Sequence, residues 1–365
     1  MRIASLVNLV GPTRGGIDRV MDQLGRGYID AGHQRLLVMP GTEDRVRSSR
    51  AGTVLTIASP ALSASTRLIL SPGKVIAALK RFRATNLEVS DKLTLTGVTA
   101  WAKKQRLPTM LLSHARLDNA ASAYLDMEMA PLIRIWNRRL GRLYQKVVVT
   151  SAYSADEWLT THARLAIVPL GVDLKAFRLP SPRPQGERLE LLFVGRLARD
   201  KGAPLAVATT VELVRRGIDV ALHMHGTGPL LDELKAMAGD VPVYFHGFTG
   251  SQHSLRDAYQ GADISLSPSP TESFGLAALE SLACGTPVVC ANRGGVRELV
   301  DANCAEWASP DPVFLADAVL RLDQRRRLNG AALQLAARQR AQQYPWASTV
   351  ERMLTIHQQL LDELV

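Results

Sequence analysis

Two glutamates in the segment PTESFGLAALESLACGTPVV (residues 270–289) have a spacing that could hold one polar ligand. Glu272 and Glu280 stand eight positions apart, slightly more than two helical turns, so they would lie near one face of a helix that Phe274 and Gly275 open. Carboxylates among so many apolar neighbours are costly unless they have partners. A solvated helix face is the alternative. We predict that both glutamates bind one hydroxyl-bearing ligand, with free N–H groups at the helix start facing a phosphate.

Two cations follow an apolar run in LLFVGRLARDKG (residues 191–202). Arg196 and Lys201 come after Gly195, where a turn at a strand end can direct both side chains toward a ligand. Fixed cations of this kind stabilise the charge that gathers on a diphosphate leaving group. The alternative is a pair of surface cations.

Two further positions near the N-terminus could contact a ligand. Gly15 and Gly16 follow the first apolar run, and glycines there allow the backbone to approach a ligand closely. His114 ends the apolar run of LLSHARLD, where it could line a cleft or be a satisfied structural group.

Several function classes are disfavoured by the motifs. Cys284, Cys290 and Cys304 form no C-x-x-C pair, which argues against zinc and against a disulfide framework. Gly226 and Gly228 lack the third glycine of a dinucleotide fingerprint, because Leu231 stands in its place. We expect no metal and no bound cofactor.

Short apolar runs alternate with amphipathic stretches along the chain, which predicts α/β architecture with parallel sheets. Expected strands are residues 3–10, 35–40, 53–58, 109–114, 146–151, 165–170, 189–195, 220–226, 241–247, 262–268 and 286–291, and expected helices include 20–32, 204–217 and 274–285.

The prolines of residues 171–188 divide this pattern in two. We predict a Rossmann-like domain over residues 1–170, a linker over 171–188 and a second Rossmann-like domain over 189–345, with a ligand cleft between them. The amphipathic segment 346–365 either docks on the second domain or crosses back to the first.

The segment TESFGLAALESLACGTPVV closely resembles the Glu-x7-Glu signature of retaining glycosyltransferase family four, and the resemblance covers nearly the whole chain. It implies the GT-B fold, with the acceptor bound by the first domain and a nucleotide sugar by the second. Gly195, Arg196, Leu197, Lys201 and Gly202 match a second family pattern, G-R-L-x-x-x-K-G.

The resemblance assigns roles to these residues. It implies catalytic roles for Glu272, His114, Arg196 and Lys201, with Glu272 on the transferred sugar. It places Glu280 on the ribose, the backbone of Gly247 and Phe248 near the base, and Gly15, Gly16, Phe274, Gly275 and Leu276 near the sugar and phosphates.

The nearest resemblance is to actinobacterial phosphatidylinositol mannosyltransferases. NLEVSDKLTL (86–95), SHARLD (113–118) and VPLGVDLKAF (168–177) are especially similar. The resemblance implies an α-mannosyltransferase that uses GDP-mannose and a glycolipid acceptor such as a phosphatidylinositol mannoside. We expect a front-face mechanism, in which Arg196, Lys201 and a helix N-terminus supply the countercharge without a metal.

Positive charge is concentrated in the N-terminal part of the chain. Residues 1–150 hold 23 Lys and Arg against 10 Asp and Glu, whereas residues 151–365 hold 21 against 24. Segments 74–84 and 131–146 interleave these cations with apolar residues, so they could lie on an anionic membrane; core-packing helices with solvated faces are the alternative. We expect a cytoplasmic protein that is peripheral at the inner face of the plasma membrane, because no apolar stretch is long enough for a signal peptide or a span.

Two other functions remain open. A sugar-nucleotide epimerase or phosphorylase could share this fold, and an epimerase would need no acceptor. The basic N-terminal half could bind nucleic acid, although it contains no helix-turn-helix, zinc-finger or aromatic-platform motif.

Overall fold

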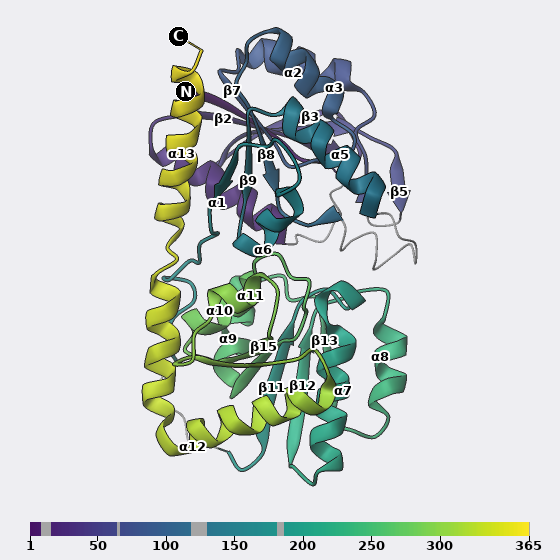
Figure 1. The fold of residues 1–365 in the computed structure, drawn as a ribbon, viewed down its shortest axis with the longest axis vertical. Helices are drawn as coiled ribbons and strands as arrows, with labels where there is room; N and C mark the ends of the chain where they lie inside the picture. Colours follow the sequence, from purple (N-terminus) through teal and green to yellow (C-terminus); the bar gives the residue numbers. More distant parts are fainter. Residues whose placement is uncertain (9–15, 64–65, 118–129, 181–185, 365) are drawn as a thin grey trace. The chain divides into compact units, whose positions relative to one another are not determined.

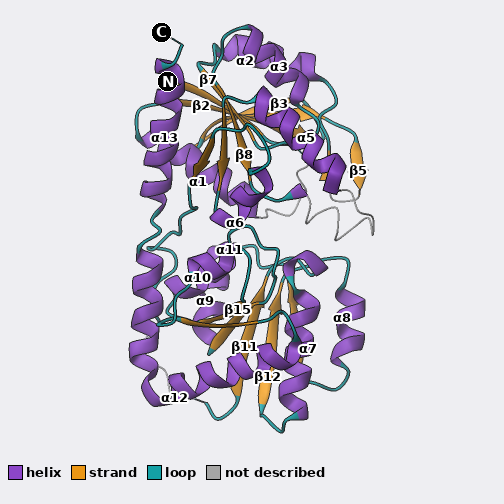
Figure 2. Ribbon diagram, in the orientation of Figure 1, coloured by secondary structure: helices purple, strands orange, loops and turns teal. Residues whose placement is uncertain are grey.

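The computed structural model describes residues 1–8, 16–63, 66–117, 130–180 and 186–364 (Figure 1). These residues form two compact units. Residues up to 170 together with residues 346–364 make up the first unit, and residues from 171 to 345 make up the second. Each unit has its own sheet with helices on both faces (Figure 2). The predicted α/β class with two Rossmann-like halves is confirmed.

The first sheet has the order β10-β9-β8-β7-β1-β2-β4-β3, and its neighbours are parallel except for β3 against β4. Its strands are β1 (Arg2–Leu6), β2 (Gln34–Gly41), β3 (Arg45–Ser49), β4 (Gly52–Ala58), β7 (Asn86–Val89), β8 (Thr109–Ser113), β9 (Lys146–Val149) and β10 (Leu165–Ile167). A separate two-stranded ribbon pairs β5 (Ala61–Ser63) with β6 (Thr66–Arg67).

Helices α2, α3 and α5 cover one face of this sheet, and α1 and α13 cover the other (Figure 1). The helices are α1 (Gly16–Asp30), α2 (Pro72–Phe82), α3 (Thr96–Lys104), α5 (Ala130–Leu143), α6 (Ala152–Ala155) and α13 (Trp346–Asp362), with a 3-10 turn η1 (Asp156–Trp158). Helix α1 ends just before Gly32, whose φ of 80° is the left-handed conformation expected at a helix end.

The second sheet is fully parallel, with the order β13-β12-β11-β14-β15-β16. Its strands are β11 (Leu189–Val194), β12 (Val220–His225), β13 (Val243–Gly247), β14 (Ile264–Ser267), β15 (Val288–Ala291) and β16 (Ala305–Ala308). The helical elements are η2 (Arg199–Lys201), α7 (Ala203–Arg215), α8 (Leu231–Ala238), α9 (Gln252–Gly261), α10 (Leu276–Ala283), α11 (Gly295–Leu299) and α12 (Pro312–Gln342), which bends at Asn329.

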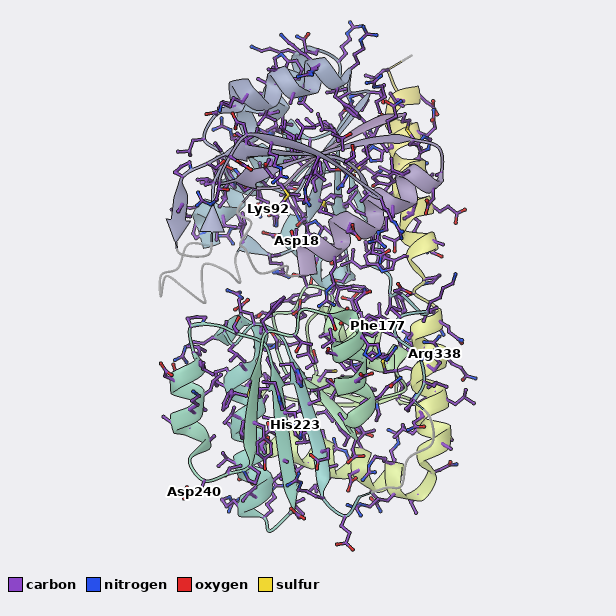
Figure 3. All side chains as sticks on the ribbon, turned by 180° about the vertical axis from the view of Figure 1, so that it is seen from behind. Asp18, Lys92, Phe177, His223, Asp240 and Arg338 are labelled. Carbon is purple, nitrogen blue, oxygen red and sulfur yellow. The ribbon has the colours of Figure 1, made fainter. Side chains whose placement is uncertain are left out.

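Residues 171–180, the first described part of the segment that we expected to be a linker, belong to the second unit. The guanidinium of Arg338, on α12, donates to the carbonyls of Leu174 and Phe177 over 2.9 and 2.6 Å. Figure 3 labels Phe177 and Arg338 within this unit. Asp173 accepts from the amides of Lys175 and Ala176, so residues 173–177 form an ordered turn.

Helix α13 belongs to the first unit, which decides between the two docking sites left open by the sequence. Gly27 of α1 lies against Val350 of α13, where an added Cβ would come within 2.3 Å of a Val350 methyl group. Further along, the buried imidazole of His357 lies 3.2 Å from a carboxylate oxygen of Glu88 on β7. The described residues contain no helix that is both long and apolar enough to cross a bilayer.

Candidate active site

The order of the second sheet brings two loops together. Strand β11 lies between β12 and β14, so the chain leaves it in one direction along the sheet and returns on its other side. In open parallel sheets the carboxyl ends at such a switch point are where ligands bind. The loop after β11 carries Arg196 and Lys201, and the loop after β14 carries Glu272.

The Lys201 ammonium and the Glu272 carboxylate form an ion pair, with Nζ and Oε2 2.7 Å apart. Only 35% of the Lys201 side chain and 20% of the Glu272 side chain are exposed. The second oxygen of Glu272 accepts from the amide of Ser273 over 3.1 Å. The structure thus joins two residues that lie 71 positions apart in the sequence.

Each partner keeps the other charged. Burial alone would raise the pKa of Glu272, but the Lys201 ammonium and the amides of Ser273 and Phe274 hold it below its usual value. Burial would lower the pKa of Lys201, but Glu272 holds it above its usual value. The Glu272 carboxylate, which can accept hydrogen bonds, and the Lys201 ammonium therefore lie side by side in the loops that follow β14 and β11.

Arg196 lies beside this pair on the same loop. One guanidinium nitrogen is 2.7 Å from Oδ2 of Asp200, and about half of the Arg196 side chain is exposed. Asp200 was not among the residues that we predicted for the site. A cation with this much exposure, four residues from its carboxylate, can turn toward an anionic ligand at little energetic cost.

The helix after Glu272 begins later than the sequence suggested. Helix α10 starts at Leu276, and Gly275 precedes it with a φ of 99°. Our prediction that Phe274 opens the helix was wrong, as was the picture of both glutamates on one helical face. Phe274 is buried in the loop, with its ring edge-to-face with Tyr344 at 6.3 Å between centroids.

Glu280 lies inside α10 and is 6% exposed. Its Oε2 accepts from the hydroxyl of Tyr259 over 3.2 Å.

Two glycines that the sequence analysis missed support the Glu272 loop. The amide of Gly295 donates to the carbonyl of Glu272 over 2.6 Å. A Cβ on Gly295 would lie 2.2 Å from the carbonyl oxygen of Ser273, and one on Gly294, whose φ is 95°, would lie 3.1 Å from that of Pro270. Glycine pairs allow such close approach, so the sequence NRGG (292–295) contained a signal for this contact.

The neighbouring strand ends carry the residues predicted for the base. Gly247 ends β13 with a φ of 72°, and its carbonyl accepts from the amide of Gly226 over 2.8 Å. Phe248 follows it, and 45% of its surface is exposed. The exposed ring is therefore available to a ligand at this edge of the sheet.

Three histidines that were not predicted lie on the neighbouring strands β12 and β13. His225 stacks on His246 at 4.4 Å between ring centroids, and His246 stacks on His223, which Figure 3 labels. Burial, together with the neighbouring histidines, lowers the pKa of His225 to about 4. The His225 ring is therefore neutral at physiological pH.

The first unit positions His114 at the end of β8. Its Nε2 lies 3.2 Å from the hydroxyl of Ser90, which follows β7, the next strand in the sheet. Burial lowers the pKa of His114 to about 4, so the ring is neutral at physiological pH. Gly16 is the first residue of α1, whereas Gly15 lies outside the described residues.

A small apolar cavity of about 20 Å³ adjoins His114 within the first unit. It is lined by Val20 and Leu24 of α1, Met353 and Thr349 of α13, and residues at the ends of β8, β9 and β10. Its size suits a water molecule rather than a substrate.

Several apolar residues of segments 74–84 and 131–146 lie in the core of the first unit. Val75 and Leu79 of α2 are buried in the core, and so are Leu140 of α5 and Tyr144, which follows it. Segment 74–84 is therefore a core-packing helix.

Two family descriptions match the chain. Residues 14–176 match "Glycosyltransferase Family 4", and residues 188–325 match "Glycosyl transferases group 1". A GDP-mannose-dependent alpha-(1-6)-phosphatidylinositol dimannoside mannosyltransferase of Mycobacterium tuberculosis is 33% identical over 97% of this chain and 95% of its own. A D-inositol 3-phosphate glycosyltransferase of Saccharomonospora viridis is 30% identical over 73% of this chain and 68% of its own.

Among solved structures, a sucrose-phosphate synthase of Thermosynechococcus elongatus superposes with a TM-score of 0.81. The match covers 100% of both chains at 22% identity. At that identity the likeness concerns the fold, which is the predicted arrangement of two Rossmann-like domains.

Proposed function

The chain belongs to glycosyltransferase family 4, and from that premise we propose that it transfers α-mannose from GDP-mannose to a phosphatidylinositol mannoside. The observation that carries the proposal is the 33% identity, over 97% of the chain, to a mannosyltransferase whose name states this donor and this class of acceptor. The geometry of the Lys201–Glu272 pair supports it, because the pair offers a cation for a phosphate beside a carboxylate for sugar hydroxyls.

The donor would occupy the carboxyl end of the second sheet. Lys201 and Arg196 would stabilise the charge that builds on the diphosphate as the glycosidic bond breaks. The positive end of α10 lies after Gly275 and would add to this stabilisation. Glu272 would accept hydrogen bonds from the mannose hydroxyls, and Gly247 with Phe248 would meet the base.

Retention of the α configuration would follow from attack on the same face that the leaving group departs from. The leaving phosphate would take the proton of the acceptor hydroxyl, while Lys201 and Arg196 balance its charge. We propose that this chemistry needs no metal. Transfer that survives EDTA supports the proposal, and loss of transfer that Mg²⁺ or Mn²⁺ restores would contradict it.

His114 would act on the acceptor side. A neutral imidazole held by Ser90 can exchange one hydrogen bond with a substrate hydroxyl without adding charge. The catalytic role that we propose for His114 is therefore to orient a substrate hydroxyl.

The acceptor would contain an inositol phosphate. Both relatives described above carry an inositol acceptor in their names, one of them on a lipid and the other as the free phosphate. The fuller coverage by the lipid-using relative, 97% against 73% of this chain, favours the lipid.

We further propose that α5 holds the protein on an anionic membrane from the cytoplasmic side. Leu132 and Ile135 expose 59% and 63% of their surface, and Arg134, Arg138 and Arg139 are exposed on the same helix. Each cation near an anionic surface contributes about 1 kcal/mol. The inserted groups would be Leu132 and Ile135, because Leu140 and Tyr144 are in the core.

Liposome co-sedimentation tests the membrane proposal. Binding should require anionic lipid, weaken as salt rises, and fall in the Leu132→Ser/Ile135→Ser variant. Arg81→Ser on α2 is the matched control and should bind like the unaltered chain. Equal sedimentation with neutral and anionic liposomes, or with neither, would contradict the proposal.

A matrix of donors and acceptors tests the proposed function. The purified protein is incubated with GDP-mannose, GDP-glucose, UDP-glucose and UDP-galactose, each with phosphatidylinositol mannosides, inositol phosphate or no acceptor. We expect a product one hexose heavier only from GDP-mannose with the lipid. Transfer to inositol phosphate, or a changed sugar nucleotide without any acceptor, would point to a different transferase or an epimerase.

A further inference from the structure

A buried ion pair lies close to His114 in the first unit, outside the groups discussed so far. Nζ of Lys92, after β7, is 2.6 Å from Oε2 of Glu157 in η1. The Lys92 side chain is 7% exposed and that of Glu157 is 2% exposed. Figure 3 labels Lys92 inside this unit.

Lys92 and Glu157 both form hydrogen bonds with the backbone that follows His114. The Lys92 ammonium donates to the carbonyl of Ala115 over 2.6 Å. Oε1 of Glu157 accepts from the amide of Leu117 over 2.8 Å. One ion pair thus fixes a carbonyl and an amide two residues apart, directly after the histidine.

The residue between those two contacts is held as well. Arg116 donates to the carbonyl of Tyr153 over 2.7 Å, and its guanidinium lies 4.6 Å from the centre of the Tyr153 ring. All three residues from Ala115 to Leu117 are therefore attached to the residues that follow β7 or β9.

Two residues of α5 also form hydrogen bonds with Lys92 and Glu157. The indole of Trp136 donates to the carbonyl of Lys92 over 2.8 Å, and the side-chain amide of Asn137 donates to Oε1 of Glu157 over 3.2 Å. Helix α5 thus binds the backbone of Lys92 and the carboxylate of Glu157.

A buried ion pair is a poor device for stability alone. Removing both charges from water costs about as much as their attraction returns, and a well-packed apolar pair is often as stable or more so. The pair instead fixes the conformation of the loop, because each charged group forms a hydrogen bond with one backbone group of the loop. Ser90 contacts the His114 ring and Lys92 contacts the loop, and both follow the same strand.

We propose that Lys92 and Glu157 are positioning residues that fix the Ala115–Leu117 backbone and thereby hold the His114 imidazole toward the acceptor. The proposal rests on the proposed function for its effect on transfer, and on geometry alone for its effect on the ring. It assigns neither residue a contact with substrate.

Two single variants separate positioning from electrostatics. Lys92→Met removes a positive charge near His114 and Glu157→Leu removes a negative one, and neither new side chain can bond to the backbone of the loop. If the pair positions the ring, both variants should lower kcat for transfer at least 10-fold, with the affinity for GDP unchanged. If only charge matters, the two variants should shift the pH profile of kcat in opposite directions.

A double variant and a control separate positioning from stability. Lys92→Met/Glu157→Leu leaves no unpaired buried charge, so its Tm should recover toward that of the unaltered chain while kcat stays low. Arg164→Gln breaks the exposed Arg164–Glu363 pair of the same unit and should leave kcat unchanged. Recovery of kcat together with Tm in the double variant would overturn the proposal.

A readout that needs no turnover completes the test. In protein labelled with ¹⁵N-histidine, the His114 signals are assigned from their loss in His114→Gln. Both single variants should shift or broaden these signals and leave those of His253, in the second unit, unchanged. His114 signals identical to those of the unaltered chain would refute the positioning role even if no acceptor were found. Absence of transfer by the unaltered chain, with altered His114 signals in the variants, would instead refute only the proposed function.

Discussion

Replacing Lys201 by methionine separates two contributions of the Lys201–Glu272 pair, one to the stability of the fold and one to activity with the donor. The change keeps much of the side-chain volume and removes the ammonium 2.7 Å from Glu272. Removing one partner of a fully buried pair costs about 3–5 kcal/mol. Since 20% of the Glu272 side chain is exposed and two amides still face it, we expect about 2–3 kcal/mol here. For a unit of this size that lowers Tm by about 4–12 °C.

The pH dependence of this loss follows from the direction of the shift. Glu272 has a lowered pKa in the folded chain, so its stabilising contribution is present above the unfolded pKa and is lost as pH falls through the folded one. The Tm difference between the variant and the unaltered chain should be largest near neutral pH and shrink in acid. Thermal unfolding followed by circular dichroism over a pH series measures it.

Activity should respond differently from stability. Without the cation at the diphosphate, kcat/KM for GDP-mannose should fall about 100-fold. The double variant Lys201→Met/Glu272→Gln has no unpaired carboxylate, so its Tm should recover while its activity does not. A Tm that is unchanged in Lys201→Met, or activity that returns in the double variant, would refute the reasoning.

Three further predictions concern single residues. Gly275→Ala should lower Tm more than Gly217→Ala. Both glycines have a positive φ, but only at Gly275 would the new Cβ meet another side chain, at 2.4 Å from a methyl group of Val296. Equal losses of Tm in the two variants would contradict this prediction. Arg196→Ala should lower kcat/KM about 100-fold while leaving Tm nearly unchanged, because its half-exposed pair with Asp200 contributes little; near-normal kinetics would remove Arg196 from the donor site. Because the pKa of His114 is about 4, kcat/KM should show no His114-dependent change between about pH 5.5 and 8, and a step near pH 6.5 that His114→Gln abolishes would be inconsistent with a neutral ring.

The sequence predicted the architecture well because the apolar runs that form buried strands are local. Eleven of the described strands overlap the predicted ranges, whereas β3, β5, β6, β16 and, inside the first sheet, β7 were missed. The β7 sequence NLEV alternates apolar residues with Asn86 and Glu88, whose partners lie elsewhere in the chain. Asn86 donates to the carbonyl of His357, and Glu88 accepts from Tyr28, so both are buried only because α1 and α13 pack there.

The sequence indicated individual residues of the candidate site but not the contacts between them. Lys201 and Glu272 were each expected to face a ligand, while their ion pair depends on the strand order around β11. The helix start was misplaced because the left-handed φ of Gly275 is set by tertiary contacts as well as by residue type. The pairing of Lys92 with Glu157 spans 65 positions and left no motif to read.

The configuration of the product tests the central claim most directly. The purified protein is given GDP-mannose, whose mannose is α-linked, with a phosphatidylinositol mannoside, and the anomeric signals of the product are assigned by NMR. The account predicts one added mannose in α linkage, as expected of a retaining enzyme of family 4. A β-linked mannose would contradict the retaining mechanism, and the absence of any mannosylated product would contradict the proposed function itself.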